Sequence, residues 1–146
     1  MILKTETETD LSTDQYAAIA AFRYELRRFL AFSEAAAASV GLPQQQHQAL
    51  LVIAGQAGPR GPTIGIIADQ LLIAPHTAAE LASRMAEAAL VTKTPSIHDR
   101  RCVELALTPK AENLLRRLTA AHLEELKTLE PALTCALGRL SRARPA

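Results

Sequence analysis

The sequence predicts a mainly α-helical protein with a small β-wing, in which a winged helix-turn-helix lies between long N- and C-terminal helices. Residues 63–89 hold two short stretches whose apolar side chains recur at helical spacing around a tight turn. After Ala89 the apolar period shortens to alternation, which is typical of half-buried strands. The residues expected on the facing sides of the two crossing helices are apolar: Ile67, Ala68, Leu71, Ile73, Ala78, Leu81 and Met85.

The composition is that of one folded domain. The chain has 146 residues, of which 49% are hydrophobic and 21% are charged, so it can bury a core of its own. Only 3% of the residues are aromatic, and an apolar fraction made mostly of alanine and leucine favours helices. No run is long enough to span a membrane and no signal peptide pattern is present, so we expect a cytoplasmic protein without a membrane partner. The two cysteines lie far apart, which fits a reducing compartment.

The first long helix is expected to begin at Ser12 and to run to Val40. Ser12 can accept hydrogen bonds from the free backbone amides of the first turn, and Gln15 can reach back to complete a capping box. Gly41 supplies the left-handed residue that ends helices, and Pro43 prevents continuation. The apolar stripe of this helix is wider than one contact face needs. It indicates either an intramolecular core or, as length and width favour, a subunit interface.

The C-terminal third is also helical. Thr108 can cap the next long helix, with Pro109 at its first position. Leucines then recur every three or four residues as far as Pro131. We expect Pro131 to break this helix and to start a last one. The sequence therefore divides into dimerisation helices at 11–41 and 109–143 around a winged helix-turn-helix lobe at 43–108, which includes a Gly- and Pro-rich loop at 55–62.

The second helix of the helix-turn-helix, beginning at Pro75, is the element that enters the DNA major groove in proteins of this kind. His76 and Thr77 can read base edges, Glu80 can accept from a cytosine amino group, and Arg84 can bind phosphate or guanine. A plain surface role for His76 and a structural ion pair for Arg84 stay open. The residues expected on the outer face of this helix are Pro75, His76, Thr77, Ala79, Glu80 and Arg84.

The loop between the two strands ends in Asp99, Arg100 and Arg101, and Lys93 lies beside it in the first strand. The net charge is only +1, but local fields decide docking and these cations lie together. A wing arginine can enter the narrow, electronegative minor groove, while an aspartate can hold a neighbouring guanidinium. We assign the DNA contact to Arg100 and the wing geometry to Asp99 and Arg101, with exchanged roles of the two arginines as the alternative.

The sequence resembles the MarR family of transcriptional regulators through Leu90-Val91, Asp99-Arg100-Arg101 and Leu107-Thr108, in this order and spacing between long helices. The resemblance implies a homodimer that binds a palindromic operator in double-stranded DNA, usually a repressor released by a small ligand or by oxidation. It also implies a short strand at Thr63–Ile64. The chain departs from the family at four positions: Leu72 and Ala89 replace common glycines, Ala74 replaces a capping serine, and Glu80 replaces a polar or basic residue.

Enzyme functions find little support. The chain has no Gly-rich phosphate loop and no nucleophile beside a plausible base, and His47, His76, His98 and His122 are scattered along it. His98 and Cys102 are too few for a metal site, so we expect no enzyme activity, no cofactor and no metal. The alternative to a DNA-binding regulator is a winged-helix protein-interaction module that has lost DNA binding, as the acidic Glu80 would allow.

Overall fold

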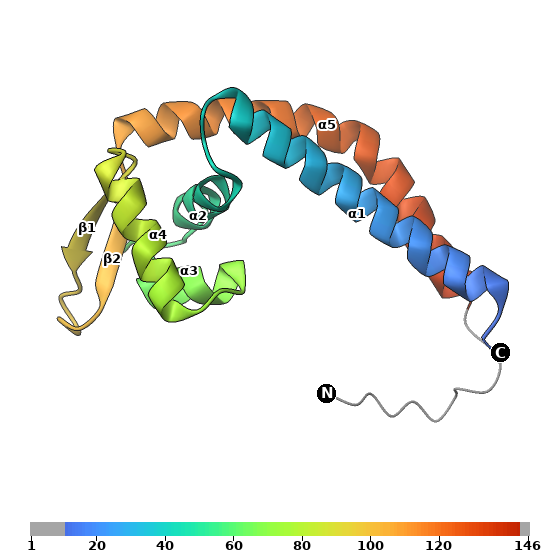
Figure 1. Cartoon of the computed structure of the whole chain (residues 1–146), viewed down its shortest axis with the longest axis horizontal. Coiled ribbons are helices and arrows are strands. Elements are labelled where there is room, and N and C mark those ends of the chain that lie inside the picture. Colours follow the sequence, from blue (N-terminus) through green and yellow to red (C-terminus); the bar gives the residue numbers. More distant parts are fainter. Residues whose placement is uncertain (1–10, 144–146) are drawn as a thin grey trace. The chain divides into compact units, whose positions relative to one another are not determined.

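The computed structural model describes residues 11–143 and is mainly helical with a two-stranded wing, which confirms the predicted fold class (Figure 1). The acidic N-terminal segment 1–10, for which the sequence indicates a frayed arm, lies outside the described residues. The elements in chain order are α1 (Thr13–Ser39), α2 (Gln44–Ala54), α3 (Ile64–Leu71), α4 (Pro75–Glu87), β1 (Val91–Pro95), β2 (Val103–Leu107) and α5 (Pro109–Arg142).

The predicted ends of α1 are confirmed to within one residue. Ser12 Oγ accepts from the backbone amide of Gln15 at 3.3 Å, and Gln15 Oε1 accepts from the amide of Ser12 at 2.7 Å, which completes the capping box. Gly41 has a φ of +73°, and the amide of Leu42 donates to the carbonyl of Ala37 at 2.9 Å. The left-handed glycine therefore ends α1 as expected.

The predicted break at Pro131 is wrong, because α5 continues through this residue to Arg142. Proline removes one backbone donor, and the carbonyl that loses its partner is that of Lys127. Both Pro131 and Lys127 are exposed, so this carbonyl can be hydrated. Leu129 and Ala136, on either side of the proline, are both buried, and this burial favours one continuous helix.

The chain forms two compact units. Of the described residues, 11–32 and 123–143 make up the first, called here the helical arm, and 33–122 make up the second, the winged lobe. Within the described part of the helical arm, α1 and α5 lie side by side (Figure 1). None of the helices within residues 11–143 is long and apolar enough to cross a membrane. The functional division at 11–41, 43–108 and 109–143 stays a prediction.

The core of the winged lobe lies where α2, α3, α4 and β2 meet, and its largest buried side chains include Leu50, Ile67, Met85 and Leu105. Of the seven apolar residues predicted to face each other in the helix-turn-helix, five are buried, while Leu71 and Ile73 pack against the core half-buried. The two short helices therefore pack as their periodicity predicts.

The wing consists of the antiparallel strands β1 and β2, in which Val91 pairs with Leu107 and Pro95 pairs with Val103. The expected strand at Thr63–Ile64 shortens to a single bridge between Thr63 and Glu104, because Ile64 already begins α3. Thr63 is extended and caps α3, with its hydroxyl accepting from the amide of Ile66 at 3.3 Å. One residue thus joins the sheet and the helix, which leaves no room for a longer strand.

Candidate nucleic-acid interface

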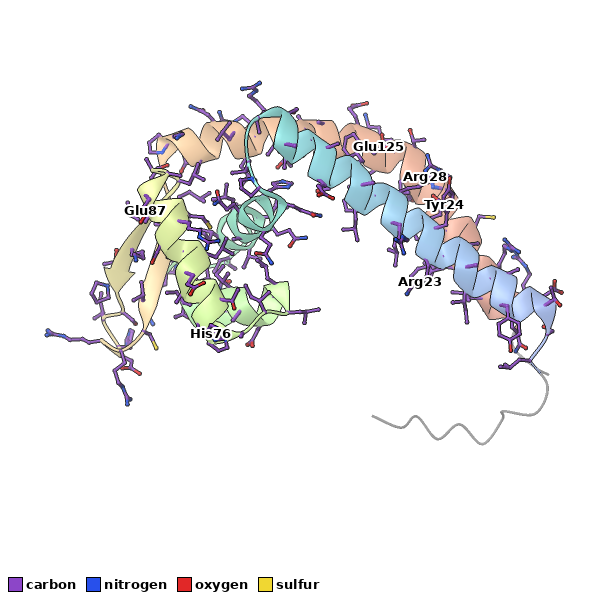
Figure 2. The ribbon with its side chains drawn as sticks, viewed as in Figure 1. Arg23, Tyr24, Arg28, His76, Glu87 and Glu125 are labelled. Atoms are coloured by element: carbon purple, nitrogen blue, oxygen red, sulfur yellow. The ribbon has the colours of Figure 1, made fainter. Side chains whose placement is uncertain are left out.

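The outer face of α4 is available for a partner. Its opposite face carries Ala78, Leu81, Ala82 and Met85 into the core. Pro75 occupies the first turn as predicted, and Ala74 provides no side-chain cap, as its replacement of a serine implies. Figure 2 shows His76 at this first turn. The remaining predicted residues of the face are exposed or half-buried: Pro75, Thr77, Ala79, Glu80 and Arg84.

The charged residues of this face have no protein partner among residues 11–143. Neither Glu80 nor Arg84 forms an ion pair there, so the structural ion pair considered for Arg84 is absent from the described part. The charged side chains of α4 are Glu80, Arg84 and Glu87, so the helix itself carries little positive charge. Attraction of a polyanion therefore depends on the neighbouring wing.

The two positions where the family commonly has glycine keep a left-handed backbone. Leu72, in the turn between α3 and α4, has φ 57° and ψ 43°, and its side chain is 92% exposed. Ala89, after α4, has φ 59°. A side chain at such a position strains the backbone by about 1 kcal/mol or more. The chain therefore keeps a left-handed turn at both positions, although neither residue is glycine.

The tip of the wing is braced by its own hydrogen bonds. The amide of Ser96 donates to the carbonyl of Cys102 at 2.8 Å, and the amide of Cys102 donates to the carbonyl of Asp99 at 2.9 Å. Asp99 Oδ1 accepts from both the backbone amide and Nε of Arg101, at 3.0 and 3.2 Å. These bonds hold the pKa of Asp99 below its ordinary value, mainly through the amide of Arg101.

Arg100 differs from Arg101 in its contacts. Arg100 is exposed and makes no hydrogen bond or ion pair with another residue in the range 11–143. Arg101 is also largely exposed, but its guanidinium is held by the carboxylate of Asp99. Cys102 is half-buried, and its thiol lies 3.8 Å from Asp99 Oδ2. One guanidinium is therefore unengaged, while the other belongs to the loop's internal bracing.

Side chains hold β1 against α4 and the start of α5 against the turn that follows α4, and sequence reasoning missed these contacts. Lys93 Nζ, which the sequence places among the expected DNA-binding cations, donates to Ser83 Oγ of α4 at 3.1 Å. Lys110 Nζ donates to the carbonyl of Ala88 at 2.8 Å. The hydroxyl of Thr108 donates to the carbonyl of Ala89 at 2.6 Å. No local pattern indicates pairs that lie 10 to 22 residues apart.

Two histidines that the sequence leaves scattered meet in the winged lobe, away from this interface. His47 of α2 and His122 of α5 have ring centroids 5.0 Å apart. His122 Nδ1 donates to the carbonyl of Leu118 at 2.6 Å, and Nε2 lies 2.9 Å from Ser33 Oγ. Burial, and then the proximity of His122, lower the pKa of His47. Within residues 11–143 no three His, Cys, Asp or Glu side chains are grouped to hold a metal ion.

A comparison with protein families matches the part of the chain that carries this interface. The model of the MarR family matches residues 40–101, from the end of α1 through the helix-turn-helix to the arginines of the wing. Over these residues, which are fewer than half of the 146, the chain is similar to the MarR family. That family consists of transcription regulators and is not enzymatic, which supports the expectation of no enzyme activity. No curated protein matches it in sequence.

Solved structures share the fold over most of the chain. AbsC, a MarR family transcriptional regulator from Streptomyces coelicolor, has a TM-score of 0.68 at 19% identity, over 88% of this chain and 82% of AbsC. MepR, a transcription regulator of the Staphylococcus aureus multidrug efflux pump MepA, has a TM-score of 0.64 at 20% identity, over 75% and 79% of the two chains. A MepR variant bound to an oligodeoxyribonucleotide has a TM-score of 0.60 at 20% identity, over 80% and 82%.

Proposed function

We propose that the protein is a cytoplasmic homodimer that binds a palindromic operator in double-stranded DNA and represses transcription until a small-molecule effector lowers its DNA affinity. The observation that carries the DNA contact is the wing tip, where Arg100 is unengaged beside the braced pair of Asp99 and Arg101. An exposed cation on a fixed loop suits a narrow, electronegative minor groove. The MepR variant bound to an oligodeoxyribonucleotide supports this use of the fold.

Base reading is proposed for the first turns of α4. His76 and Thr77 carry donors and acceptors for base edges, and the Ala79 methyl can contact the methyl of thymine. Pro75 brings the backbone of the first turn towards the groove. Glu80 would accept from a cytosine amino group, and Arg84 would bind phosphate or guanine. In the wing, Lys93 and Arg101 would add positive charge near phosphates.

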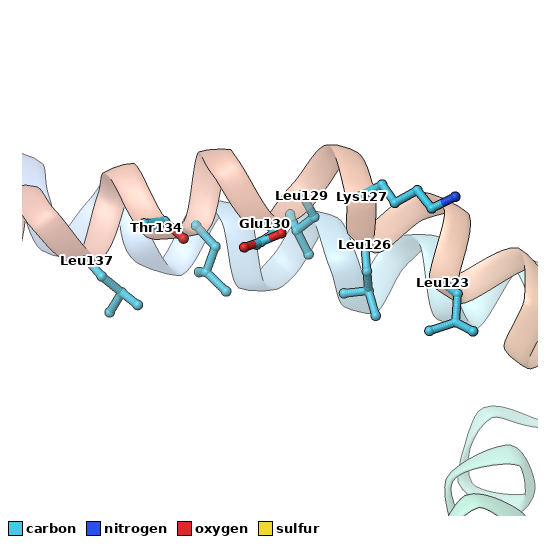
Figure 3. A pocket seen from close by; sticks show the side chains of 8 residues that line it. Leu123, Leu126, Lys127, Leu129, Glu130, Thr134 and Leu137 are labelled. Carbon is cyan, nitrogen blue, oxygen red and sulfur yellow. The ribbon is translucent and has the colours of Figure 1, made fainter.

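Homodimer formation is supported by apolar surface in the helical arm. A groove of about 600 Å³ lies along α5 (Figure 3). The side chains of Leu123, Leu126 and Leu137 along it are 58%, 37% and 49% exposed. On α1, Ile19 and Leu30 are also about half exposed. Apolar side chains at this density need a partner, and a second copy of the arm supplies the same kind of surface.

The arrangement on DNA follows from twofold symmetry. A homodimer carries two copies of α4, and the protein's twofold axis is matched by two half-sites of a palindromic operator. Repression and release by a small molecule are proposed by analogy with the family, and the effector itself is unknown.

A second candidate function is a winged-helix module that binds another protein in place of DNA. The specific observation in its favour is the charge of α4, where Glu80 and Glu87 outnumber Arg84. Such a module would use the same exposed face of α4 for a protein partner. It would have no affinity for DNA at physiological salt.

A footprint on the DNA upstream of the protein's own reading frame separates the two functions. We expect protection of two half-sites whose centres lie about 10 base pairs, or one helical turn, apart. Sedimentation of the same preparation should show a dimer. No protection at any concentration up to the micromolar range would exclude the regulator and leave the protein-interaction module.

A further inference from the structure

The tip of the wing carries one strongly exposed apolar side chain that the proposed function does not use. Ile97 lies in the loop between β1 and β2 and is 92% exposed, as much as the turn residue Leu72. The sequence predicts this loop as polar, and its other residues fit that description. A β-branched side chain left in water at a loop tip buries no apolar surface within its own lobe.

The backbone on both sides of Ile97 is held in place. Ser96 is buried, and its amide donates to the carbonyl of Cys102 at 2.8 Å. The amide of His98 donates to Ser96 Oγ at 3.3 Å, which closes a tight turn around Ile97. The loop therefore presents this side chain in one direction, and a partner that covers it would not first have to order the loop.

The surroundings of Ile97 favour DNA as the occupant. Arg100 and Arg101 lie three and four residues further along the same loop and are exposed, so the tip attracts a polyanion. Ile97 has no exposed apolar neighbour within the loop, and only Pro95, the last residue of β1, lies exposed beside it, so the patch is too small to hold a protein surface. The minor groove is narrow enough to enclose one side chain, and apolar side chains do contact DNA there.

We propose that Ile97 enters the minor groove beside Arg100 and makes the wing prefer A·T to G·C pairs. Guanine places its N2 amino group in the minor groove, whereas A·T pairs present only acceptors there. An apolar side chain over that amino group removes its water and returns no hydrogen bond. This inference rests on the proposed DNA-binding function and adds a specificity-determining residue to it.

The test uses inosine, which lacks the N2 amino group of guanine. Each A·T pair in the flanks of the footprinted operator, outside the half-sites that α4 reads, is replaced first by G·C and then by I·C. An I·C pair looks like G·C in the major groove and like A·T in the minor groove. Wild-type protein should bind at least one G·C variant about tenfold more weakly than the A·T and I·C operators, within the range for one mismatched pair.

The variants assign this preference to Ile97. Ile97→Ser should bind the A·T, I·C and G·C operators at that position within about twofold of one another, and Ile97→Leu should restore the tenfold preference. Leu72→Ser, which alters an equally exposed side chain of the same lobe, should keep the wild-type preference. An unchanged preference in Ile97→Ser, or none in wild type, would overturn the inference. Wild-type protein that failed to bind even the unaltered operator would instead overturn the proposed function.

Discussion

The substitution Gly61→Ala tests the contact that seats the Gly- and Pro-rich loop on β2. A Cβ atom added to Gly61 would lie 1.8 Å from the carbonyl oxygen of Leu105 and 2.8 Å from its carbonyl carbon. The next residue accepts a hydrogen bond, because the amide of Leu105 donates to the carbonyl of Pro62 at 2.9 Å. Backbone atoms cannot rotate aside as a side chain can, so the loop must move off the strand.

The expected loss has two parts. Leu105 is 1% exposed, so breaking its bond to Pro62 leaves a buried amide without a partner, which costs about 1 to 3 kcal/mol. Displacing the packed segment costs about 1 to 3 kcal/mol more. We expect the free energy of unfolding to fall by about 3 kcal/mol, and the melting temperature to fall by about 10 °C in a chain of this size.

Urea and thermal unfolding followed by circular dichroism measure this change. Gly65→Ala is the matched control, because its added Cβ would meet only Thr63 Oγ1, at 3.7 Å, and Gly65 lies within α3. That variant should be as stable as wild type or more stable by up to about 1 kcal/mol. Equal unfolding midpoints for Gly61→Ala and wild type would refute the close approach of the loop to β2.

Three further predictions concern backbone strain, pH and assembly. Leu72→Gly and Ala89→Gly should each raise the free energy of unfolding by about 1 kcal/mol, because both residues are left-handed and exposed; a lower urea midpoint in both would contradict this. The pKa of His47 is lowered from 6.5 in the fold, so the unfolded chain binds more protons below pH 6.5 and stability falls as the pH falls. His47→Leu should flatten this dependence below about pH 6.5, and a slope identical to that of wild type would argue against it. Replacing Leu126 and Leu137 by aspartate should weaken dimerisation and lower stability together, because both side chains are partly exposed in one chain and the proposed dimer would bury them, at up to about 2 kcal/mol for each leucine; a well-folded wild-type monomer at micromolar concentration in sedimentation would contradict this prediction.

Much of the fold could be predicted because its signals are local. The capping box of Ser12 and Gln15 and the left-handed Gly41 are encoded within a few residues, and the helix-turn-helix follows from apolar spacing. The predicted helix end at Pro131 was wrong because proline alone indicates a break, whereas the residues around it favour a continuous helix. On an exposed face water can replace the lost hydrogen bond, and the buried side chains of Leu129 before the proline and Ala136 after it favour one helix.

In the candidate site, too, contacts between residues close in sequence could be predicted, and contacts between distant residues could not. The link from Asp99 to Arg101 spans two residues, so the sequence alone suggests it. The bond from Lys93 to Ser83 depends on how β1 lies against α4, and no pattern along the chain indicates it. His47 and His122 lie 75 residues apart and meet only through the packing of α2 and α5.

The salt dependence of DNA binding tests the central claim most directly, with wild type, Arg100→Ala and Asp99→Ala measured on the footprinted operator. Wild-type affinity should fall steeply as salt rises, because binding releases counterions from phosphates. Arg100→Ala should bind more weakly, with a slope of log affinity against log salt that is shallower by about 1 to 2 per dimer. Its stability should change by no more than about 0.5 kcal/mol, because this side chain is exposed and unpaired within residues 11–143. Asp99→Ala should weaken binding by loosening the wing at nearly the wild-type slope. Arg100→Ala protein that bound as tightly as wild type with the same slope would contradict the account.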